Sequence, residues 1–176
     1  FAVSGSELAI DSDGVLTFAS APDYETKTSY TATITASDGA SNSSTQDITV
    51  NINNLNDNSP AFSSGAAFSA DENQTAIGTV TGTDADGDSI SFTVSGSELA
   101  ITSAGVLTFT SAPDYETKTS YTATVTASDG INSGTQDVTI NVSDLDDEAP
   151  VITSSASLSA DENQTAIGTI TATDAD

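Results

Sequence analysis

Residues 121–128 read Tyr-Thr-Ala-Thr-Val-Thr-Ala-Ser, and apolar and hydroxyl-bearing side chains alternate along this stretch. A period of two is typical of a β-strand with one face in a core and the other in water. Residues 90–94 and 138–142 show the same alternation. The sequence therefore predicts an all-β fold with half-buried strands.

Further short strands are predicted around residues 66–69, 77–80, 99–101 and 107–109. Seven short strands in roughly 90 residues favour a seven-stranded Greek-key β-sandwich. In the second of these strands the alternation fails across Gly78, which predicts a β-bulge at this position. We expect neighbouring strands of the sandwich to be antiparallel, so successive connections should alternate between its two ends.

The chain is internally repetitive. Residues 1–39 match residues 92–130 at 34 of 39 positions, and residues 70–86 match 160–176 at 15 of 17. The period is that of one small domain, which indicates tandem repeats in a linear array. We expect residues 1–58 to be the C-terminal part of one repeat, 59–149 a complete repeat, and 150–176 the N-terminal part of the next. The chain is thus expected to be an excerpt of a longer array.

Composition excludes several classes of function. The chain has 26 acidic and 2 basic residues, a net charge of -24, so nucleic acids and anionic membrane surfaces are not expected partners. Cysteine and histidine are absent, which excludes disulfides, Cys/His zinc sites and histidine-dependent catalytic triads. No apolar run approaches the roughly 20 residues that span a bilayer, so no direct membrane insertion of this segment is expected.

An enzyme is not expected. Asp114 and Glu116 lie two residues apart in a predicted tight turn, where they cannot face each other across a sugar as a glycosidase pair does. No aromatic-lined cleft is evident in the sequence. An EF-hand loop beginning at Asp84 is also excluded, because its sixth position is Ser89 and its twelfth is Ser95, in place of Gly and Glu.

The acidic residues fall in the loops at the two ends of the predicted sandwich. A short linker that ends in proline would bring the bottom of one repeat against the top of the next. The set expected at the first junction is Asp23, Glu25, Asp57, Asp84, Asp86 and Asp129, with Asn54 and Asn56 as neutral oxygen donors. The set expected at the second junction is Glu72, Asp114, Glu116, Asp144, Asp146, Asp147, Asp174 and Asp176.

So many carboxylates in one cleft require cations. Two like unit charges 4 Å apart repel by roughly 4 kcal/mol at an effective dielectric constant near 20. Hard oxygen ligands without nitrogen or sulfur favour Ca²⁺, which takes six to eight oxygens, over Mg²⁺, which prefers fewer ligands and keeps its water. We therefore expect two or three Ca²⁺ ions at each junction, bridged by shared carboxylates.

At these residues the chain resembles the cadherin repeat family. The matching motifs are Asp-Glu-Asn at 71–73, Thr-Asp-Ala-Asp at 83–86, Asp-Tyr-Glu at 114–116, Ala-Ser-Asp-Gly at 127–130 and Asn-Leu-Asn-Asp-Asn-Ser-Pro at 54–60. The last motif adds Asn58 to the expected ligands. Among relatives of this type, the Thr-rich and Lys-poor units look like the cadherin-like arrays of large bacterial surface or secreted adhesins.

The resemblance also implies roles for single residues. Glu72, Asp114 and Glu116 would bind the inner ions together with Asp147, and Asp144 with Asp176 would help to bridge them. Asp146 and Asp174 would bind the outermost ion with a backbone oxygen of Glu148. The first linker departs from the second at one important position, because Asn54 stands where the second has Asp144. This site carries less charge and is expected to bind calcium more weakly.

The sequence thus predicts an extracellular, cell-surface or secreted stalk that Ca²⁺ makes rigid and that supports cell adhesion. Its partners would be neighbouring repeats of the same chain. One alternative is that the Thr-rich faces themselves mediate homophilic or glycan binding. Another is that identical chains assemble into a filament by strand donation, because residues 1–53 lack two strands that residues 151–176 would supply. The latter alternative predicts that Ile167 and Ile170 are buried against a neighbouring chain.

Overall fold

The computed structural model describes residues 1–176 as an all-β chain, which confirms the predicted fold class. It divides into two compact units. Unit 1 comprises Phe1–Asn58 with Asp84–Asp88, and unit 2 comprises Ser59–Thr83 with Ser89–Asp176. The strands of unit 1 are β1 (Ala2–Val3), β2 (Leu8–Ile10), β3 (Leu16–Phe18), β4 (Ser29–Ser37) and β5 (Ser43–Asn51).

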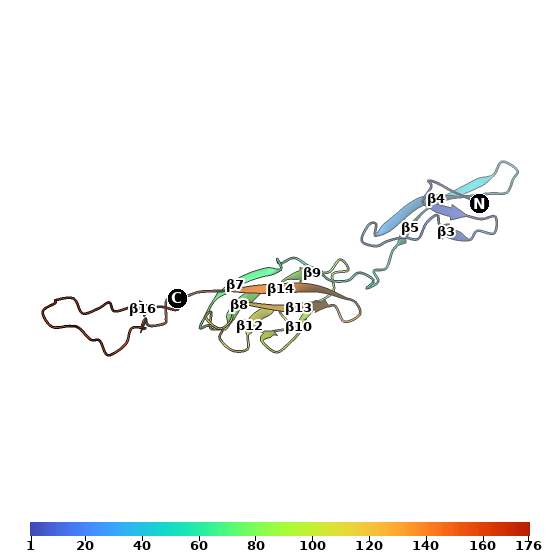
Figure 1. Ribbon diagram of the computed structural model, residues 1–176. Coiled ribbons are helices and arrows are strands. Elements are labelled where there is room, and N and C mark those ends of the chain that lie inside the picture. The colour runs from blue at the N-terminus through green and yellow to red at the C-terminus, as the bar shows by residue number, and fades with distance from the viewer. The chain divides into compact units, whose positions relative to one another are not determined.

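Unit 2 holds the complete sandwich and a short ribbon (Figure 1). The strands of the sandwich are β6 (Ala61–Phe62), β7 (Ala67–Asp71), β8 (Ala76–Thr79), β9 (Gly82–Thr83), β10 (Ser91–Val94), β11 (Leu99–Ile101), β12 (Val106–Phe109), β13 (Ser120–Ser128) and β14 (Ser133–Ser143). The ribbon pairs β15 (Val151–Ile152) with β16 (Ala172–Thr173). No helix is present that could cross a membrane.

Two sheets make the sandwich. One has the strand order β10-β13-β14-β7, the other has the order β11-β12-β8, and β6 pairs separately with β9. The alternation at residues 121–128 places the side chains of Val125 and Ala127 in the core, where neither is accessible to solvent. Leu107 from the facing sheet and Ile140 from β14 are equally buried and belong to the same apolar cluster. The period-two pattern thus determines which face of each strand is buried.

The first strand departs from the antiparallel arrangement that the sequence predicts. It is split into β6, which pairs antiparallel with β9, and β7, which pairs in parallel with β14, with Thr139 opposite Ala67. Between them the chain changes sheets through Ser63–Ala66, where Ser63 and Ser64 donate to the carbonyl of Thr81. The predicted second strand is likewise split into β8 and β9. Because β7 has crossed to the other sheet, it runs in the same direction as the last strand.

The β-bulge predicted at Gly78 is confirmed. Leu107 lies opposite Gly78 and Thr108 lies opposite Ala76, so Ile77 is the extra residue on β8. A Cβ atom on Gly78 would lie 3.3 Å from the ring of Phe68, so a glycine lets that ring pack against the strand.

Gly105 is required for both its conformation and its lack of a side chain. It has a φ of +88°, and a Cβ atom there would lie 2.1 Å from the carbonyl oxygen of Val80. The backbone that follows β8 is held at this close distance by a hydrogen bond of 2.9 Å from the Val80 N–H to the Gly105 carbonyl. Such a close approach of two backbones leaves no room for a side chain.

The five strands of unit 1 are the counterparts of β10–β14. The hairpin β4–β5 pairs Ser29 with Asn51, as the hairpin β13–β14 pairs Ser120 with Asn141. The edge-to-face contact between the rings of Phe18 and Tyr30, with centroids 5.2 Å apart, repeats that of Phe109 and Tyr121 at 4.9 Å. Residues 1–58 contain no counterparts of β6–β9. The division into three repeats at 58/59 and 149/150 stays a prediction.

Candidate metal centre

A buried glutamate anchors the acidic end of unit 2. Glu72 follows β7 and is only 2% exposed. Its carboxylate accepts hydrogen bonds from the backbone N–H groups of Tyr115, at 2.8 Å, and Leu145, at 2.9 Å. A buried carboxylate needs such donors to offset the loss of hydration. Glu72 therefore joins the loop after β7, the β12–β13 loop and the exit from β14.

The second acidic cluster forms around Glu72. We give this name to Glu72, Glu116, Asp144, Asp147 and Asp176. Single oxygens of Glu72, Glu116 and Asp144 lie within 4.8 Å of one another, and so do single oxygens of Glu116, Asp147 and Asp176. Glu116 belongs to both triplets, so the cluster has the form of two adjacent sites that share a bridging carboxylate. The structure thus brings together five of the residues that the sequence assigned to the second junction.

Mutual repulsion contributes to raised pKa values of two carboxylates in this cluster. The pKa of Asp144 is raised by desolvation and then by the charges of Asp176, Glu72, Asp147 and Asp146. The pKa of Glu116 is also raised: its own backbone amide favours the carboxylate, but desolvation and the charges of Glu72, Asp144 and Asp176 outweigh it. Raised pKa values of this origin mean that the cluster favours the binding of positive charge.

Neither of the two basic residues provides that charge. Lys118 lies 2.5 Å from the carboxylate of Glu98 and 4.2 Å from the ring centre of Tyr121. Lys27 makes the equivalent contacts with Glu7, at 2.5 Å, and Tyr30, at 4.4 Å. These are the only ion pairs in residues 1–176. The carboxylates of the acidic clusters therefore have no cationic side chain as a partner.

Asn73 connects the loop after β7 to the β12–β13 loop and to Asp147. It has a φ of 61°, in the left-handed region that asparagine tolerates better than most residues. Its backbone N–H donates to the carbonyl of Pro113 at 3.0 Å, and its side-chain amide donates to the carboxylate of Asp147. Asn73 was not among the predicted ligands, although it belongs to the Asp-Glu-Asn motif.

The first acidic cluster lies in unit 1. It consists of Glu25, Asp57 and Asp86, whose oxygens lie within 4.8 Å of one another. The linker amides surround Asp86: Asn58 donates to its two carboxylate oxygens from the backbone, at 2.9 Å, and from the side chain, at 3.1 Å. Asn54 donates to its backbone carbonyl at 2.8 Å. Two of the three predicted asparagine ligands, Asn54 and Asn58, thus act here as hydrogen-bond donors.

The pKa values of two carboxylates in the first cluster shift in opposite directions. Desolvation disfavours the Asp86 carboxylate, but the hydrogen bonds from Asn58 outweigh it, and the pKa of Asp86 is lowered. The pKa of Glu25 is raised, because desolvation and the neighbouring Asp86 outweigh the effect of its own backbone amide. Amide donors therefore stabilise the Asp86 carboxylate in the first cluster, whereas the pKa values of Glu116 and Asp144 in the second cluster are both raised.

A third group overlaps the first cluster at Asp86. Asp84, Asp86 and Asp88 bring their oxygens within 4.8 Å of one another around a turn in which Gly87 has a φ of +82°. One oxygen of Asp84 accepts from the Asp86 N–H at 2.9 Å. The other oxygen, Oδ2, is buried and has no hydrogen-bond partner. Asp88 was not among the predicted ligands, although its alternation with Asp84 and Asp86 is a signal in the sequence.

Several predicted ligands lie outside these groups. Asp114 accepts from the N–H and hydroxyl of Thr117, and Asp23 from those of Thr26, so both carboxylates cap their own loops. Asp129, in unit 2, caps the β13–β14 turn through the N–H groups of Ile131 and Asn132. The other predicted acidic ligands outside the groups are Asp146, Glu148 and Asp174. Of these, Glu148 donates its N–H to Asp176 at 2.9 Å and Asp174 accepts from the Ala175 N–H at 3.0 Å. The groups consist of acidic residues alone and so do not test the predicted ligand Asn56.

The donor set fits calcium. All the ligands in the three groups are carboxylate oxygens, and neighbouring carbonyls and amides can complete a coordination shell of six to eight oxygens. The partnerless Asp84 oxygen and the raised pKa values of Glu116 and Asp144 are the imbalances that a divalent cation would remove. Softer metals are disfavoured because the chain has no cysteine or histidine.

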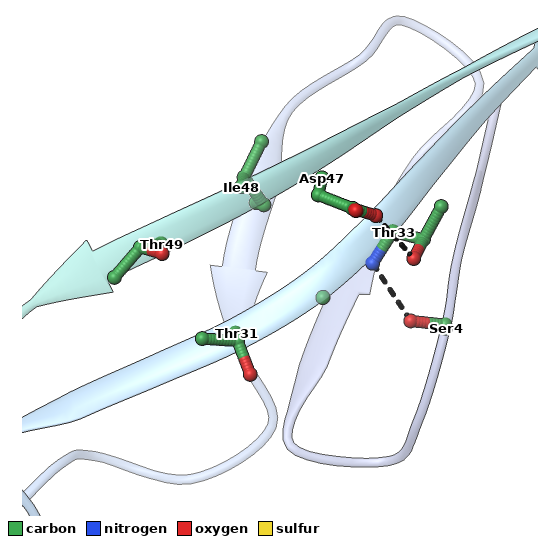
Figure 2. A pocket seen from close by; sticks show the side chains of 7 residues that line it. Ser4, Thr31, Thr33, Asp47, Ile48 and Thr49 are labelled. Carbon is green, nitrogen blue, oxygen red and sulfur yellow. Dashed lines mark hydrogen bonds between the residues drawn. The ribbon is translucent and has the colours of Figure 1, made fainter.

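A shallow groove on the β4–β5 hairpin is the other recurrent surface feature (Figure 2). In it the Thr33 hydroxyl donates to Asp47 at 2.7 Å and the Thr33 N–H donates to the hydroxyl of Ser4 at 2.8 Å. Thr124 makes the same bonds to Asp137 and Ser95 in unit 2. In both grooves a serine, a threonine and an aspartate are thus bonded to one another, and no aromatic ring lines either groove. Glycan binding by these faces stays a prediction.

Residues 56–143, half of the chain, match the family described as bacterial Ig domain. The chain belongs to this bacterial Ig domain family. Within it, the repeats are cadherin-like, as the sequence predicts. The Drosophila melanogaster protocadherin-like wing polarity protein stan is 35% identical over 80% of this chain, and human protocadherin Fat 1 is 37% identical over 85%.

Solved structures agree with the cadherin-like fold of the repeats. Extracellular cadherin domains 3-6 of protocadherin gamma B2 match 86% of the chain and 42% of their own length, with a TM-score of 0.76 and 25% identity. Domains EC22-24 of mouse cadherin-23 match 99% of the chain and 64% of their own length, with a TM-score of 0.74 and 25% identity. The chain spans only about 4% of the length of the curated relatives named above.

Proposed function

We propose that this chain is a calcium-stiffened segment of an extracellular adhesive stalk. Cadherin-like adhesion repeats are non-enzymatic, and they generally bind calcium. The observation that carries the proposal is the second acidic cluster, in which two triplets of carboxylates share Glu116 and no cationic side chain takes part. Ca²⁺ bound there would neutralise the repulsion among the exit from β14, the β12–β13 loop and Asp176.

The proposed stiffening of the linker depends on the fact that the ligands come from different segments. Asp144 and Asp147 lie on the exit from β14, Glu116 lies in a loop of the sandwich, and Asp176 follows β16. Ions held in the two adjacent sites, bridged by Glu116, would fix the linker to the sandwich on one side and to the following ribbon on the other. Without the ion, charge repulsion would favour a flexible linker. A stalk of such repeats would keep an adhesive partner site at a distance from the cell surface.

Chelation tests the proposal. In millimolar calcium we expect residues 144–150 and 54–60 to resist proteolysis and the thermal midpoint to be high. Excess EDTA should open both linkers to cleavage and lower the midpoint, and magnesium should restore neither fully. A suitable control is Asp137→Asn, which removes one charge outside the clusters and should respond to calcium like the wild type. If cleavage and the thermal midpoint are the same with and without calcium, the proposal is wrong.

A further inference from the structure

Lys118 lies in the loop that carries Glu116, and its side chain is held against the sandwich. Its ammonium group lies 2.5 Å from the carboxylate of Glu98, directly before β11, and 4.2 Å from the ring centre of Tyr121 on β13. We call Glu98, Lys118 and Tyr121 the lysine clamp. The clamp joins the end of the β12–β13 loop to two other segments of the sandwich.

The same loop is attached at its other end, next to the second acidic cluster. The Tyr115 N–H donates to the buried carboxylate of Glu72 at 2.8 Å. Within the loop, the Lys118 N–H donates to the Asp114 carbonyl at 2.9 Å and closes a single turn. Glu116 is the central residue of this turn. The direction of its side chain therefore depends on the attachments at both ends of the loop.

Glu116 has a demanding place in the second acidic cluster. It is exposed, and it belongs to both carboxylate triplets. An exposed glutamate on a mobile loop would lose conformational freedom when an ion binds, and this loss lowers the affinity. A loop that is already fixed at both ends reduces the loss. The affinity of both sites should therefore depend on how firmly the loop is held.

The arrangement occurs a second time, in unit 1. Lys27 lies 2.5 Å from the carboxylate of Glu7 and 4.4 Å from the ring centre of Tyr30. It follows Glu25 of the first acidic cluster by two residues, as Lys118 follows the bridging glutamate of the second. The chain has only these two basic residues, so both of its cationic side chains occupy the same position in the repeat.

We propose that Lys118 is a positioning residue for the second acidic cluster, a role that rests on the proposed binding of calcium there. Through the lysine clamp it holds the β12–β13 loop so that Glu116 is directed at both metal sites. Glu98 neutralises the ammonium charge, so the effect on affinity comes from the geometry of the loop. An exposed ion pair and a cation–π contact are each weak, so loss of the clamp should lower calcium affinity about 5-fold.

Two substitutions of opposite charge distinguish positioning from electrostatics. Lys118→Met makes the region more negative and Glu98→Gln makes it less negative, yet both break the ion pair. Charge alone would raise calcium affinity in the first variant and lower it in the second. Positioning lowers it in both, and the double variant should be no weaker than either single variant, because both remove the same contact. Lys118→Arg keeps the ion pair and the ring contact and should bind like the wild type.

The measurement is the calcium concentration that half-protects residues 144–150 of the 176-residue chain from proteolysis. Residues 54–60 in the same sample are the internal control, because Lys118→Met leaves the first acidic cluster unchanged. The matched variant Lys27→Met should give the reverse pattern. Urea denaturation in EDTA should give nearly equal midpoints for all variants, because the side chains of both ion pairs are at least 40% exposed.

The outcomes separate this role from the proposed function. If calcium protects residues 144–150 in the wild type, but the half-protecting concentration is unchanged or lower in Lys118→Met, the positioning role alone is wrong. An affinity that Lys118→Arg fails to retain would also contradict it. If calcium does not protect the wild type, the proposed function fails and the positioning role fails with it.

Discussion

Glu72 accepts a hydrogen bond of 2.9 Å from the backbone N–H of Leu145, although 73 residues separate the two in the sequence. The contact joins the beginning of the repeat to its exit, and it places a buried negative charge at the base of the second acidic cluster. One carboxylate thus has two roles, as a structural acceptor and as a proposed metal ligand. These roles respond differently to substitution, which makes them separable by experiment.

Replacing Glu72 should separate structure from metal binding. Glu72→Ala leaves the Tyr115 and Leu145 N–H groups without their acceptor and should cost about 2–4 kcal/mol of unfolding free energy, even in EDTA. Glu72→Gln keeps one oxygen acceptor, so its loss in EDTA should be smaller. Both variants should weaken the stabilisation by calcium. Urea denaturation with and without calcium measures these effects, and equal losses for both variants in EDTA would argue against the structural role.

Asp144 should be a destabilising residue when calcium is absent. Its pKa is raised by desolvation and by four neighbouring carboxylates, so Asp144→Asn should increase stability in EDTA at neutral pH. The same change removes a proposed ligand and should weaken calcium binding about 10-fold or more, because affinity depends on the charge of the ligands. Calorimetric titration and thermal denaturation test the two effects. If Asp144→Asn lowers the stability in EDTA, the inferred repulsion between Asp144 and the neighbouring carboxylates is wrong.

The destabilisation caused by the charged carboxylates of Glu116 and Asp144 depends on pH, and the raised pKa values determine its sign. Since the pKa values of Glu116 and Asp144 are raised, the folded state binds more protons than the unfolded state just above their ordinary values of 4.5 and 3.8. Stability from these two groups therefore falls as the pH rises through that range, and the deficit persists at neutral pH. The gain in stability from Glu116→Gln with Asp144→Asn, measured in EDTA, should shrink as the pH is lowered from 7 to about 4. A gain that grows towards acid would be inconsistent with raised pKa values.

Gly105 and Gly14 offer a matched comparison. Both have a φ near +88°, so alanine at either position carries about 1–2 kcal/mol of backbone strain. Only at Gly105 would the added Cβ also lie 2.1 Å from the Val80 carbonyl, whereas at Gly14 it meets the Phe1 ring at 3.3 Å. Gly105→Ala should therefore cost at least about 2 kcal/mol more than Gly14→Ala. Denaturation followed by amide exchange of each unit measures this difference.

The sequence predicted the features that depend on local pattern. Alternation at residues 121–128 identified β13 and its buried face, and Gly78 marked the bulge. The crossing of the first strand at Ser63–Ala66 was not predictable, because the choice between two sheets depends on contacts with β9 and β14 far along the chain. Among the acidic residues expected to bind metal, Glu116 and Asp147 lie in groups of three carboxylates, whereas Asp114 accepts hydrogen bonds from Thr117 in its own loop. The sequence places each acid in a loop but does not determine which way its side chain points.

The parallel pairing of β7 with β14 has a mechanical consequence. β7 is near the start of the sandwich in unit 2 and β14 is its last strand, and residues 67–71 lie alongside residues 139–143. Tension that pulls the two ends of the repeat apart would slide these strands along each other, so their hydrogen bonds would share the load and have to break together. The hydrogen bonds would break one after another only if the force acted at right angles to the strands. Such a repeat should yield at a high force when it is stretched along the chain.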